Sequence, residues 1–380
     1  MAKIKVLAFI IGMNNGGAQK IVLDNALNFI DDTEIDFSIC SIHKYRKLSN
    51  YEKELKSKGI KIGYATSFID KIIFRLKPEV RTKRIVQSCK KQIDKYKPDI
   101  IHIHLCGAML YAAQAAEECN VPIRFYTLHS NPFRQTGEIL SAIQLAFTKQ
   151  NFTALCLNNL QYNQAKDYYH INRYEILRNG IDFKKIRDNA ISKLEARKLF
   201  TLSDYDFVIS CVGRLDPIKN YSFMLDVMSL VINKQVNAKL VFAGDGSEQQ
   251  KLENKAEKLG IKKNVIFLGN LQDVIPVYCA SDVFCLTSIN EASPLVLLEA
   301  QAVKTYCVVS AGVPEESIIS DKVCHMKEDS TAEEWANAIL NKNFIGKPVC
   351  TETECEVNNA TKNLKAIYLK YFKEYTSNEK

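Results

Sequence analysis

The feature that most restricts the fold of this chain is a regular alternation of short apolar runs with helical patterns. Each run is three to nine residues long and rich in Ile, Val, Leu and Phe, which is typical of buried strands. Strand–helix alternation of this kind predicts βαβ units and a parallel sheet. The runs lie at 3–11, 34–41, 99–105, 121–128, 155–157, 207–213, 238–243, 265–269 and 282–287, with a short strand near Ile60.

The pattern restarts once, which predicts two domains of the α/β class. A strand that ends in Asn179-Gly180 is followed by a linker near 180–188, and the chain of 380 residues has room for two domains of ordinary size. We therefore expect a first domain over 1–182 and a second over 183–361. Hydrophobic content of 47% and charged content of 25% are typical of globular proteins.

Nothing at the start of the chain indicates a leader, and no apolar run approaches the length that spans a bilayer. The twelve cysteines form no C-x-x-C pair. Cys156, Cys211, Cys285 and Cys307 lie inside apolar runs, where buried thiols are expected. This usage favours a reducing cytoplasm over a disulfide-linked fold.

The net charge of +8 comes from the first half of the chain. Residues 1–180 carry 26 basic and 16 acidic side chains, and ten of these basic residues fall within 71–97. Ile72, Phe74 and Val86 are interleaved with them, so the segment can bind an anionic membrane surface. An ordinary solvated helix face is the alternative. Nucleic acid is not expected, because no DNA- or RNA-binding module is present.

The stretch 282–302 concentrates the chemistry. Glu291 is predicted in a strand-to-helix loop and Glu299 in the second turn of the next helix, at the carboxyl end of a strand, where open α/β sheets bind ligands. Pro294 suits the first turn and Ser293 can cap it. The amides near Leu295 and Val296 then form an anion site at the helix N-terminus. Carboxylates that bind sugar hydroxyls beside amides that bind phosphate suit a nucleotide-sugar.

Cations follow a neighbouring strand of the second half. Arg214 and Lys219 come directly after the run 207–213, so they lie at the mouth of the same predicted sheet as Glu291. Cations in such a position neutralise a diphosphate and stabilise it as it leaves. The alternative is two ordinary surface cations.

The first half offers weaker signals. Gly16 and Gly17 form a glycine-rich turn between strand and helix that lets backbone approach a ligand, although it is not the G-x-G-x-x-G fingerprint. His102 and His104 share one face of their strand, and a structural role is as plausible for them as a functional one. His129 is better placed for function, because it lies in a loop on the ligand side.

Together these motifs resemble the family 4 retaining glycosyltransferases of the GT-B fold. The run 294–302 is especially similar to bacterial capsule and exopolysaccharide transferases, and Ala292 stands where glycine often follows the first Glu. The matching pieces, over nearly the whole chain, are Gly16-Gly-Ala-Gln19, 99–104, His129, Asn179-Gly-Ile-Asp182, Val212-Gly-Arg-Leu215, Lys219-Asn220, Gly244-Asp-Gly246, Phe267-Leu-Gly269 and Glu291-x7-Glu299.

The resemblance implies two Rossmann-like domains facing across a cleft, with a helix of about 362–380 crossing back to the first. It implies a nucleotide-sugar donor, most often UDP-linked, on the second domain and a glycan or polyprenyl-linked saccharide acceptor on the first, in the cytoplasm at the inner membrane face. No metal or other cofactor is implied. Catalytic roles fall to Arg214, Lys219, Glu291 and His129, and donor contacts to Gly16, Gly17, Gly213, Arg214, Lys219, Gly244, Asn270, Glu291, Leu295, Val296 and Glu299.

Two rival functions remain at this level. A nucleotide-sugar 2-epimerase uses a similar fold and releases nucleotide without an acceptor. A non-catalytic partner subunit of a transferase is the other. Such subunits tend to lose the charged donor residues, whereas Arg214, Lys219, Glu291 and Glu299 are all present here.

Overall fold

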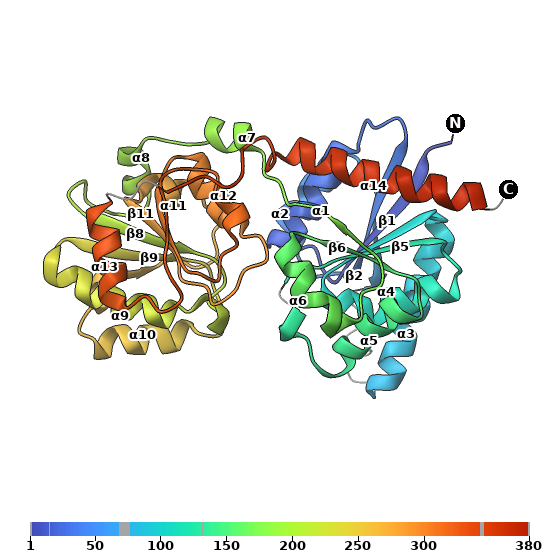
Figure 1. Cartoon of the computed structure of the whole chain (residues 1–380), viewed down its shortest axis with the longest axis horizontal. Helices are drawn as coiled ribbons and strands as arrows, with labels where there is room; N and C mark the ends of the chain where they lie inside the picture. Colours follow the sequence, from blue (N-terminus) through green and yellow to red (C-terminus); the bar gives the residue numbers. More distant parts are fainter. Residues whose placement is uncertain (1, 15, 68–76, 131, 343–345, 379–380) are drawn as a thin grey trace. The chain divides into compact units, whose positions relative to one another are not determined.

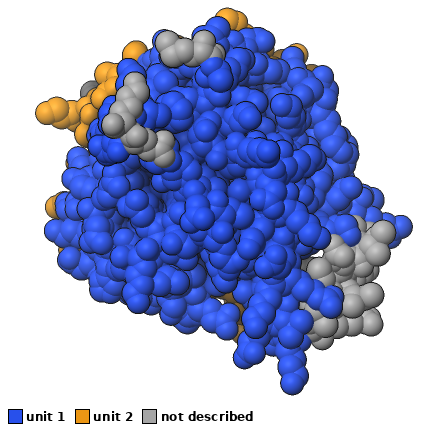
Figure 2. All heavy atoms as spheres, turned by 90° about the vertical axis from the view of Figure 1, so that its right-hand side faces the viewer, with its two compact units in different colours: residues 1–180, 357–380 blue, residues 181–356 orange. Residues whose placement is uncertain are grey.

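A computed structural model describes the whole chain except residues 1, 15, 68–76, 131, 343–345 and 379–380. The chain divides into two compact units (Figure 1). Unit 1 comprises residues 1–180 and 357–380, and unit 2 comprises residues 181–356. The atoms of unit 1 that face the viewer in Figure 2 form one continuous surface, although they come from both ends of the chain.

Unit 1 is built on a parallel sheet of seven strands in the order β3-β2-β1-β4-β5-β6-β7. The interior strand β1 pairs in parallel with β2 and β4, and every described neighbour pair in this sheet is parallel. All carboxyl ends therefore lie at one edge. The strands are β1 (Ile4–Ile10), β2 (Ile35–His43), β3 (Ile62–Thr66), β4 (Ile100–His104), β5 (Ile123–Thr127), β6 (Thr153–Cys156) and β7 (Tyr174–Ile176).

Two layers of helices cover this sheet. On one face the core includes Val22 of α1, Leu55 of α2 and Leu364 of α14. On the other it includes Ile85 of α3, Met109 of α4 and other residues of the helices that follow. The helices are α1 (Gly17–Asn28), α2 (Asn50–Ser57), α3 (Pro78–Tyr96), α4 (Cys106–Glu118), α5 (Gly137–Thr148), α6 (Asn159–Tyr169) and α14 (Val357–Asn378), with the short 3-10 helix η2 (Pro132–Arg134).

The last helix, α14, starts at Val357 and belongs to unit 1. It is drawn in red beside α1 and the sheet in Figure 1. Lys365 joins it to Asp32 at 2.7 Å, and Tyr368 is fully buried against the sheet. The helix begins five residues before the expected Lys362, because Val357 already follows the last bridge of unit 2, between Ile181 and Glu356.

Unit 2 contains a second parallel sheet, in the order β10-β9-β8-β11-β12-β13. Core residues such as Met224, Leu252 and Trp335 cover one face, and residues such as Tyr278 and Leu297 cover the other. The strands are β8 (Phe207–Val212), β9 (Ala238–Ala243), β10 (Val265–Phe267), β11 (Val283–Leu286), β12 (Tyr306–Val309) and β13 (Val323–His325). The helices are α7 (Phe183–Asp188), α8 (Lys193–Leu199), α9 (Tyr221–Lys234), α10 (Gln249–Lys258), α11 (Ile275–Ala280), α12 (Leu295–Ala302) and α13 (Ala332–Asn341), with 3-10 turns η3 (Pro217–Lys219), η4 (Lys262–Asn264) and η5 (Glu315–Ser317).

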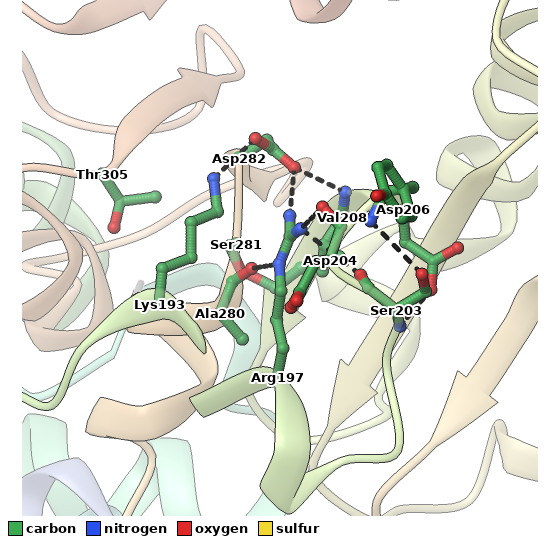
Figure 3. Close-up of polar contacts among 12 residues, drawn as sticks. Lys193, Arg197, Ser203, Asp204, Asp206, Val208, Ala280, Ser281, Asp282 and Thr305 are labelled. Atoms are coloured by element: carbon green, nitrogen blue, oxygen red, sulfur yellow. Dashed lines mark hydrogen bonds and ion pairs between the residues drawn. The ribbon is translucent and has the colours of Figure 1, made fainter. Parts of the chain in front are cut away.

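A buried ionic network holds α8 to the amino ends of β8 and β11 (Figure 3). Arg197 contacts the Asp282 carboxylate at 2.9 Å and donates to the carbonyls of Ala280 at 3.2 Å and Asp204 at 2.6 Å. The same carboxylate accepts the backbone N–H of Val208 at 2.8 Å. Since both strands begin here, the network lies at the edge opposite to their carboxyl ends and is structural.

The basic segment of residues 71–97 differs in part from the expected surface of interleaved basic and apolar side chains. Residues 68–76, with Ile72 and Phe74, lie outside the described residues. Within α3, Ile85 and Val86 belong to the core, so they are not available to a membrane. The outward face of α3 carries Lys83, Arg84 and Lys91 instead, with Val80 exposed in its first turn.

Candidate functional site

Three glycines lie where two strands of unit 2, β8 and β9, end at the carboxyl edge of its sheet. Gly213, Gly244 and Gly246 have positive φ values of 145°, 146° and 157°. The backbone N–H of Gly213 donates to Ala243 at 2.9 Å. A Cβ on Gly244 would stand 2.0 Å from the Gly213 carbonyl oxygen, so only glycine permits this approach. The ends of β8 and β9 are thereby fixed against each other.

The same edge brings Lys219 and Glu291 together. The Lys219 ammonium lies 2.5 Å from Glu291 Oε1, and the Ser288 hydroxyl donates to the same oxygen at 2.6 Å. Both charged side chains are mostly buried, with 17% and 15% exposed. The main chain at Lys219 is itself fixed by Thr287, whose hydroxyl donates to the Lys219 carbonyl at 2.7 Å. A cation and an anion are thus held side by side at the strand ends.

The loop that carries Glu291 is braced by a second loop. The Glu291 N–H donates to the Gly312 carbonyl at 2.8 Å. A Cβ on Gly312 would stand 2.1 Å from the Ile289 carbonyl oxygen, so glycine is required for this contact. Ala292 lies outside the set of described residues with positive φ, and it is buried. The loop therefore accommodates alanine at the position where glycine was expected.

The start of α12 corrects one prediction. The helix begins at Leu295, with Pro294 in the N-cap position in extended conformation, and no side chain caps it. Pro294 is thus one residue earlier than predicted, and Ser293 does not cap. The first-turn amides at Leu295 and Val296 receive no side-chain cap, as an anion site requires.

Glu299 lies in the second turn of α12, as predicted, and is half-buried. Its Oε2 accepts a hydrogen bond of 3.0 Å from the hydroxyl of Tyr278 on α11. Tyr278 is fully buried, and burial together with the Glu299 charge raises the pKa of its hydroxyl well above the usual value. The tyrosine therefore stays protonated and donates.

Arg214 and Asn270 complete the predicted set in unit 2. Both are exposed, Arg214 directly after Gly213 and Asn270 directly after Gly269. The Gly269 carbonyl accepts the N–H of Gly244 at 2.8 Å, so the end of β10 lies beside the end of β9. Arg214 and Asn270 therefore extend from the same edge, at strands that β9 separates.

In unit 1 the predicted residues lie at the carboxyl edge of the first sheet. Gly17 is the first residue of α1, and Gly16 is its N-cap in extended conformation. A Cβ on Gly16 would meet the Gln19 side chain at 2.6 Å, and Gln19 in turn donates to the Gly12 carbonyl at 3.2 Å. His129 follows β5 in the chain and is partly exposed.

Three histidines cluster at this edge. The ring of His104 lies on that of His102, with centroids 4.0 Å apart, and its Nδ1 is 2.9 Å from His129 Nε2. His102 bonds to the hydroxyls of Tyr368 and Thr127, each at 2.6 Å, which makes it structural. His104 Nε2 is buried and has no hydrogen-bond partner among the described residues.

Burial lowers the pKa of all three histidines. It lowers the pKa of His129 to about 4. Burial and the nearby His129 lower the pKa of His102 to about 3 and that of His104 well below its usual value, where His102 contributes as well. At neutral pH the cluster is uncharged, so His129 can exchange hydrogen bonds but supplies no fixed positive charge.

Beside the cluster lies a cavity of about 20 Å³, lined by His102, His104, Thr127, Asp24 and Arg178 among others. Its size suits one water molecule and is far below that of a sugar site. In the described part of the chain, no three or more His, Cys, Asp and Glu side chains are grouped so that they could hold a metal ion. None of the described helices is both long and apolar enough to cross a membrane.

Sequence reasoning missed several residues of this arrangement. Ser288, Tyr278 and Gly312 act through Glu291 and Glu299, yet none belongs to a recognisable charge pattern. The one available signal is that Ser288 stands three residues before Glu291. Gly312 is distant in sequence and meets the loop only through the fold.

Comparison with known structures defines the class. The chain is similar to a crystal structure of HepE from Anabaena in complex with UDP and glucose, with a TM-score of 0.75 and 18% identity over 96% of this chain and 99% of that one. Two Rossmann-like parallel-sheet units of this kind form the GT-B fold, which confirms the predicted fold class.

The family follows from the sequence. Residues 192–341 match the model of the family described as glycosyl transferases group 1. This match over 192–341 confirms the resemblance to glycosyltransferases that the motifs indicated.

Two relatives extend the match beyond unit 2. The protein called glycosyltransferase EpsF in Bacillus subtilis (strain 168) is 25% identical over 90% of this chain and 89% of its own length. A UDP-Gal:alpha-D-GlcNAc-diphosphoundecaprenol alpha-1,3-galactosyltransferase of Escherichia coli is 29% identical over 61% of this chain and 62% of its own length.

Proposed function

We propose that this glycosyltransferase moves a sugar, with retention of anomeric configuration, from a UDP-sugar to a lipid-linked saccharide during synthesis of a bacterial surface polysaccharide. The observation that carries the proposal is the Lys219–Glu291 pair, which lies at the carboxyl edge of the second sheet in the loop that leads to α12. That edge combines groups that can bind an anion with groups that can bind hydroxyls.

The chemistry divides among the residues of unit 2. Cleavage of the sugar–diphosphate bond builds negative charge on phosphate, which Arg214, Lys219 and the amides of Leu295 and Val296 stabilise. Lys219 exchanges part of its contact with Glu291 for a phosphate oxygen, and Glu291 then accepts hydrogen bonds from the sugar hydroxyls. In this scheme Glu299 binds the ribose hydroxyls and Asn270 contributes to the donor site. Gly213 and Gly244 fix the ends of β8 and β9 beside that site.

The leaving phosphate takes the proton of the acceptor hydroxyl, so no side-chain general base is needed. The depressed pKa of His129 supports this assignment, because a neutral imidazole beside the transferred sugar can accept or donate a hydrogen bond without repelling positive charge at the anomeric carbon. Gly16 and Gly17 let the start of α1 approach the substrates.

A lipid-linked acceptor suits the charge of unit 1. The outward face of α3 carries Lys83, Arg84 and Lys91, whose charge would hold unit 1 at an anionic inner leaflet from the cytoplasmic side. The Escherichia coli relative is named for a diphosphoundecaprenol acceptor, which supports the same class of acceptor here.

The direct test is a product assay with purified protein. UDP-glucose, UDP-galactose and their N-acetyl counterparts are offered with and without an undecaprenyl-diphosphate-linked sugar, with and without EDTA. We expect UDP release to depend on the acceptor, a glycosylated lipid with an α-linkage from an α-linked donor, and no loss of rate with EDTA. The last expectation follows from the scheme above, in which cations and amides neutralise the diphosphate without a metal ion.

Each other outcome excludes part of the proposal. UDP release with a free epimerised sugar and no acceptor would identify a nucleotide-sugar 2-epimerase. Binding of UDP without turnover on any acceptor would favour a non-catalytic partner subunit. Abolition of turnover by EDTA, with recovery on adding Mg²⁺, would overturn the metal-independent scheme.

A further inference from the structure

Tyr278 is built into unit 2 with little freedom to move. Its ring is fully buried and packs edge-on against Phe284 of β11, with ring centroids 5.4 Å apart and an angle of 84° between the planes. Its backbone carbonyl accepts hydrogen bonds from the Thr305 hydroxyl at 3.0 Å and from the Ser281 N–H at 3.2 Å. The hydroxyl is therefore held at one place beneath α12.

At that place the Tyr278 hydroxyl meets the carboxylate of Glu299. The distance from Tyr278 Oη to Glu299 Oε2 is 3.0 Å, and the tyrosine donates because its buried hydroxyl keeps its proton. A glutamate side chain has several rotatable bonds, and fixing them before a ligand arrives raises affinity by removing the entropy loss on binding. A charged acceptor also makes this a strong kind of hydrogen bond.

We propose that Tyr278 is a positioning residue of the donor site, which holds the Glu299 carboxylate in the orientation that receives both ribose hydroxyls of the donor nucleotide. The inference rests on the proposed function, in which Glu299 binds the ribose. It adds a specificity role: the tyrosine hydroxyl makes the site discriminate between ribose and a sugar that lacks these hydroxyls.

The test compares two nucleotides in three proteins. Dissociation constants of UDP and of 2′,3′-dideoxy-UDP are measured by calorimetry for wild type, Tyr278→Phe and Tyr169→Phe. Tyr169 is the matched control, because it is also a buried tyrosine whose hydroxyl makes a hydrogen bond, to the Pro132 carbonyl at 2.9 Å, and it lies in unit 1.

We expect the wild type to prefer UDP by about 100-fold, because the dideoxy analogue lacks both hydroxyls that donate to the Glu299 carboxylate. Tyr278→Phe should weaken UDP binding by ~10-fold and leave dideoxy-UDP binding unchanged, so the preference falls to ~10-fold. Tyr169→Phe should keep the full preference. In a Glu299→Gln background, Tyr278→Phe should change the preference far less than in the wild type.

The outcomes separate two kinds of failure. If the wild type binds both nucleotides equally, Glu299 does not read the ribose and this proposal falls with that assignment. If the wild type discriminates but Tyr278→Phe discriminates equally well, or loses affinity for both nucleotides alike, only the role of Tyr278 is overturned. Should Tyr278→Phe fail to fold, Thr305→Val, which releases the Tyr278 carbonyl, tests the same ratio and should lower it less.

Discussion

At the scale of single residues, the carboxyl edge of the sheet in unit 2, where we propose the donor site, is ordered by opposite charges that hold each other in place. Lys219 and Ser288 both contact one oxygen of Glu291, so the carboxylate is oriented before any ligand binds. Mostly buried ion pairs contribute little net stability, because both partners lose hydration. The Lys219–Glu291 pair at the strand ends is therefore better explained by ligand binding than by a contribution to folding.

Removal of the proposed donor contacts should reduce the rate without unfolding the protein. Arg214→Ala and Glu299→Ala are each expected to lower kcat/KM for the UDP-sugar by about 10²–10³, the usual effect of losing one preorganised charged group. Lys263→Ala is the matched control, since Lys263 is an exposed cation of the same unit that precedes β10, at the opposite edge of the sheet. Steady-state kinetics and thermal unfolding measure both effects, and near-normal rates for either variant would remove that residue from the site.

At the scale of secondary-structure elements, α8 is attached to its sheet by one carboxylate with two cations of different burial. Arg197 and Lys193 both contact Asp282, yet the arginine side chain is 6% exposed and the lysine side chain 46% exposed. Burial decides the energetic weight of the two contacts, because water screens only the exposed pair.

This contrast predicts unequal losses of stability. Arg197→Ala should lower the free energy of unfolding by about 3–5 kcal/mol, since it leaves Asp282 partly buried without its main partner. Lys193→Ala should lower it by no more than about 1 kcal/mol. Urea denaturation followed by circular dichroism distinguishes them, and equal losses would show that burial does not govern this network.

The histidines at the ends of β4 and β5 predict how stability depends on pH. Their pKa values are lowered in the folded state, so between pH 6.5 and about 4 the unfolded chain binds more protons than the folded one. The contribution of these neutral histidines to stability is therefore fully present above pH 6.5. Below it the free energy of unfolding falls as the pH falls, by up to about 1.4 kcal/mol per pH unit for each histidine that stays neutral.

Denaturation in urea at pH 7, 6, 5 and 4 measures this slope. His102→Gln should reduce the slope of the unfolding free energy against pH by the contribution of one histidine. His43 adds to the same window, because burial, followed by the charge of Arg81, lowers its pKa too. An unchanged slope in His102→Gln, or a wild-type stability that does not fall between pH 6.5 and 4, would contradict the assigned pKa values.

At the scale of the whole molecule, charge is distributed unevenly between the halves of the chain. The excess of basic residues belongs to the first 180 residues, and α3 directs several of them to solvent while its apolar face is used by the core. The remaining exposed apolar side chain of α3 is Val80, so any membrane binding by this helix depends mainly on charge.

Liposome sedimentation at low salt tests that dependence. Each basic residue near an anionic surface contributes about 1 kcal/mol, so Lys83→Glu, Arg84→Glu and Lys91→Glu together should weaken binding by at least ~10²-fold. The control triple Lys258→Glu, Lys262→Glu and Lys263→Glu makes the same change in net charge on unit 2 and should bind as the wild type does. Binding should also fall as salt rises.

Absence of wild-type binding to phosphatidylserine-rich liposomes at low salt would show that α3 presents an ordinary solvated face. Equal weakening by both triples would show that net charge, and not this helix, is responsible. The first of these results would direct the search for an acceptor toward soluble saccharides.

Much of the fold was determined by the sequence alone, because local patterns are enough to form parallel strands and helices. The alternation of apolar runs predicted both sheets but not the strands β12 and β13, which are only four and three residues long. Glu291-x7-Glu299 predicted a loop carboxylate followed by one in the second turn of a helix. Local sequence also sets the bounds of α3, which begins at Pro78 and ends shortly before Pro98, since proline restricts the backbone around it.

The tertiary structure decided what no local pattern contains. Only the fold places Ser288 and Lys219 on one oxygen of Glu291, Gly312 beneath the Glu291 loop, and the Tyr278 hydroxyl on Glu299. It also turned Ile85 and Val86 inward, where the sequence left a membrane role open. The physical reason is that helix and strand patterns depend on neighbours a few residues away, whereas hydrogen-bond partners and burial depend on which elements the sheet brings side by side.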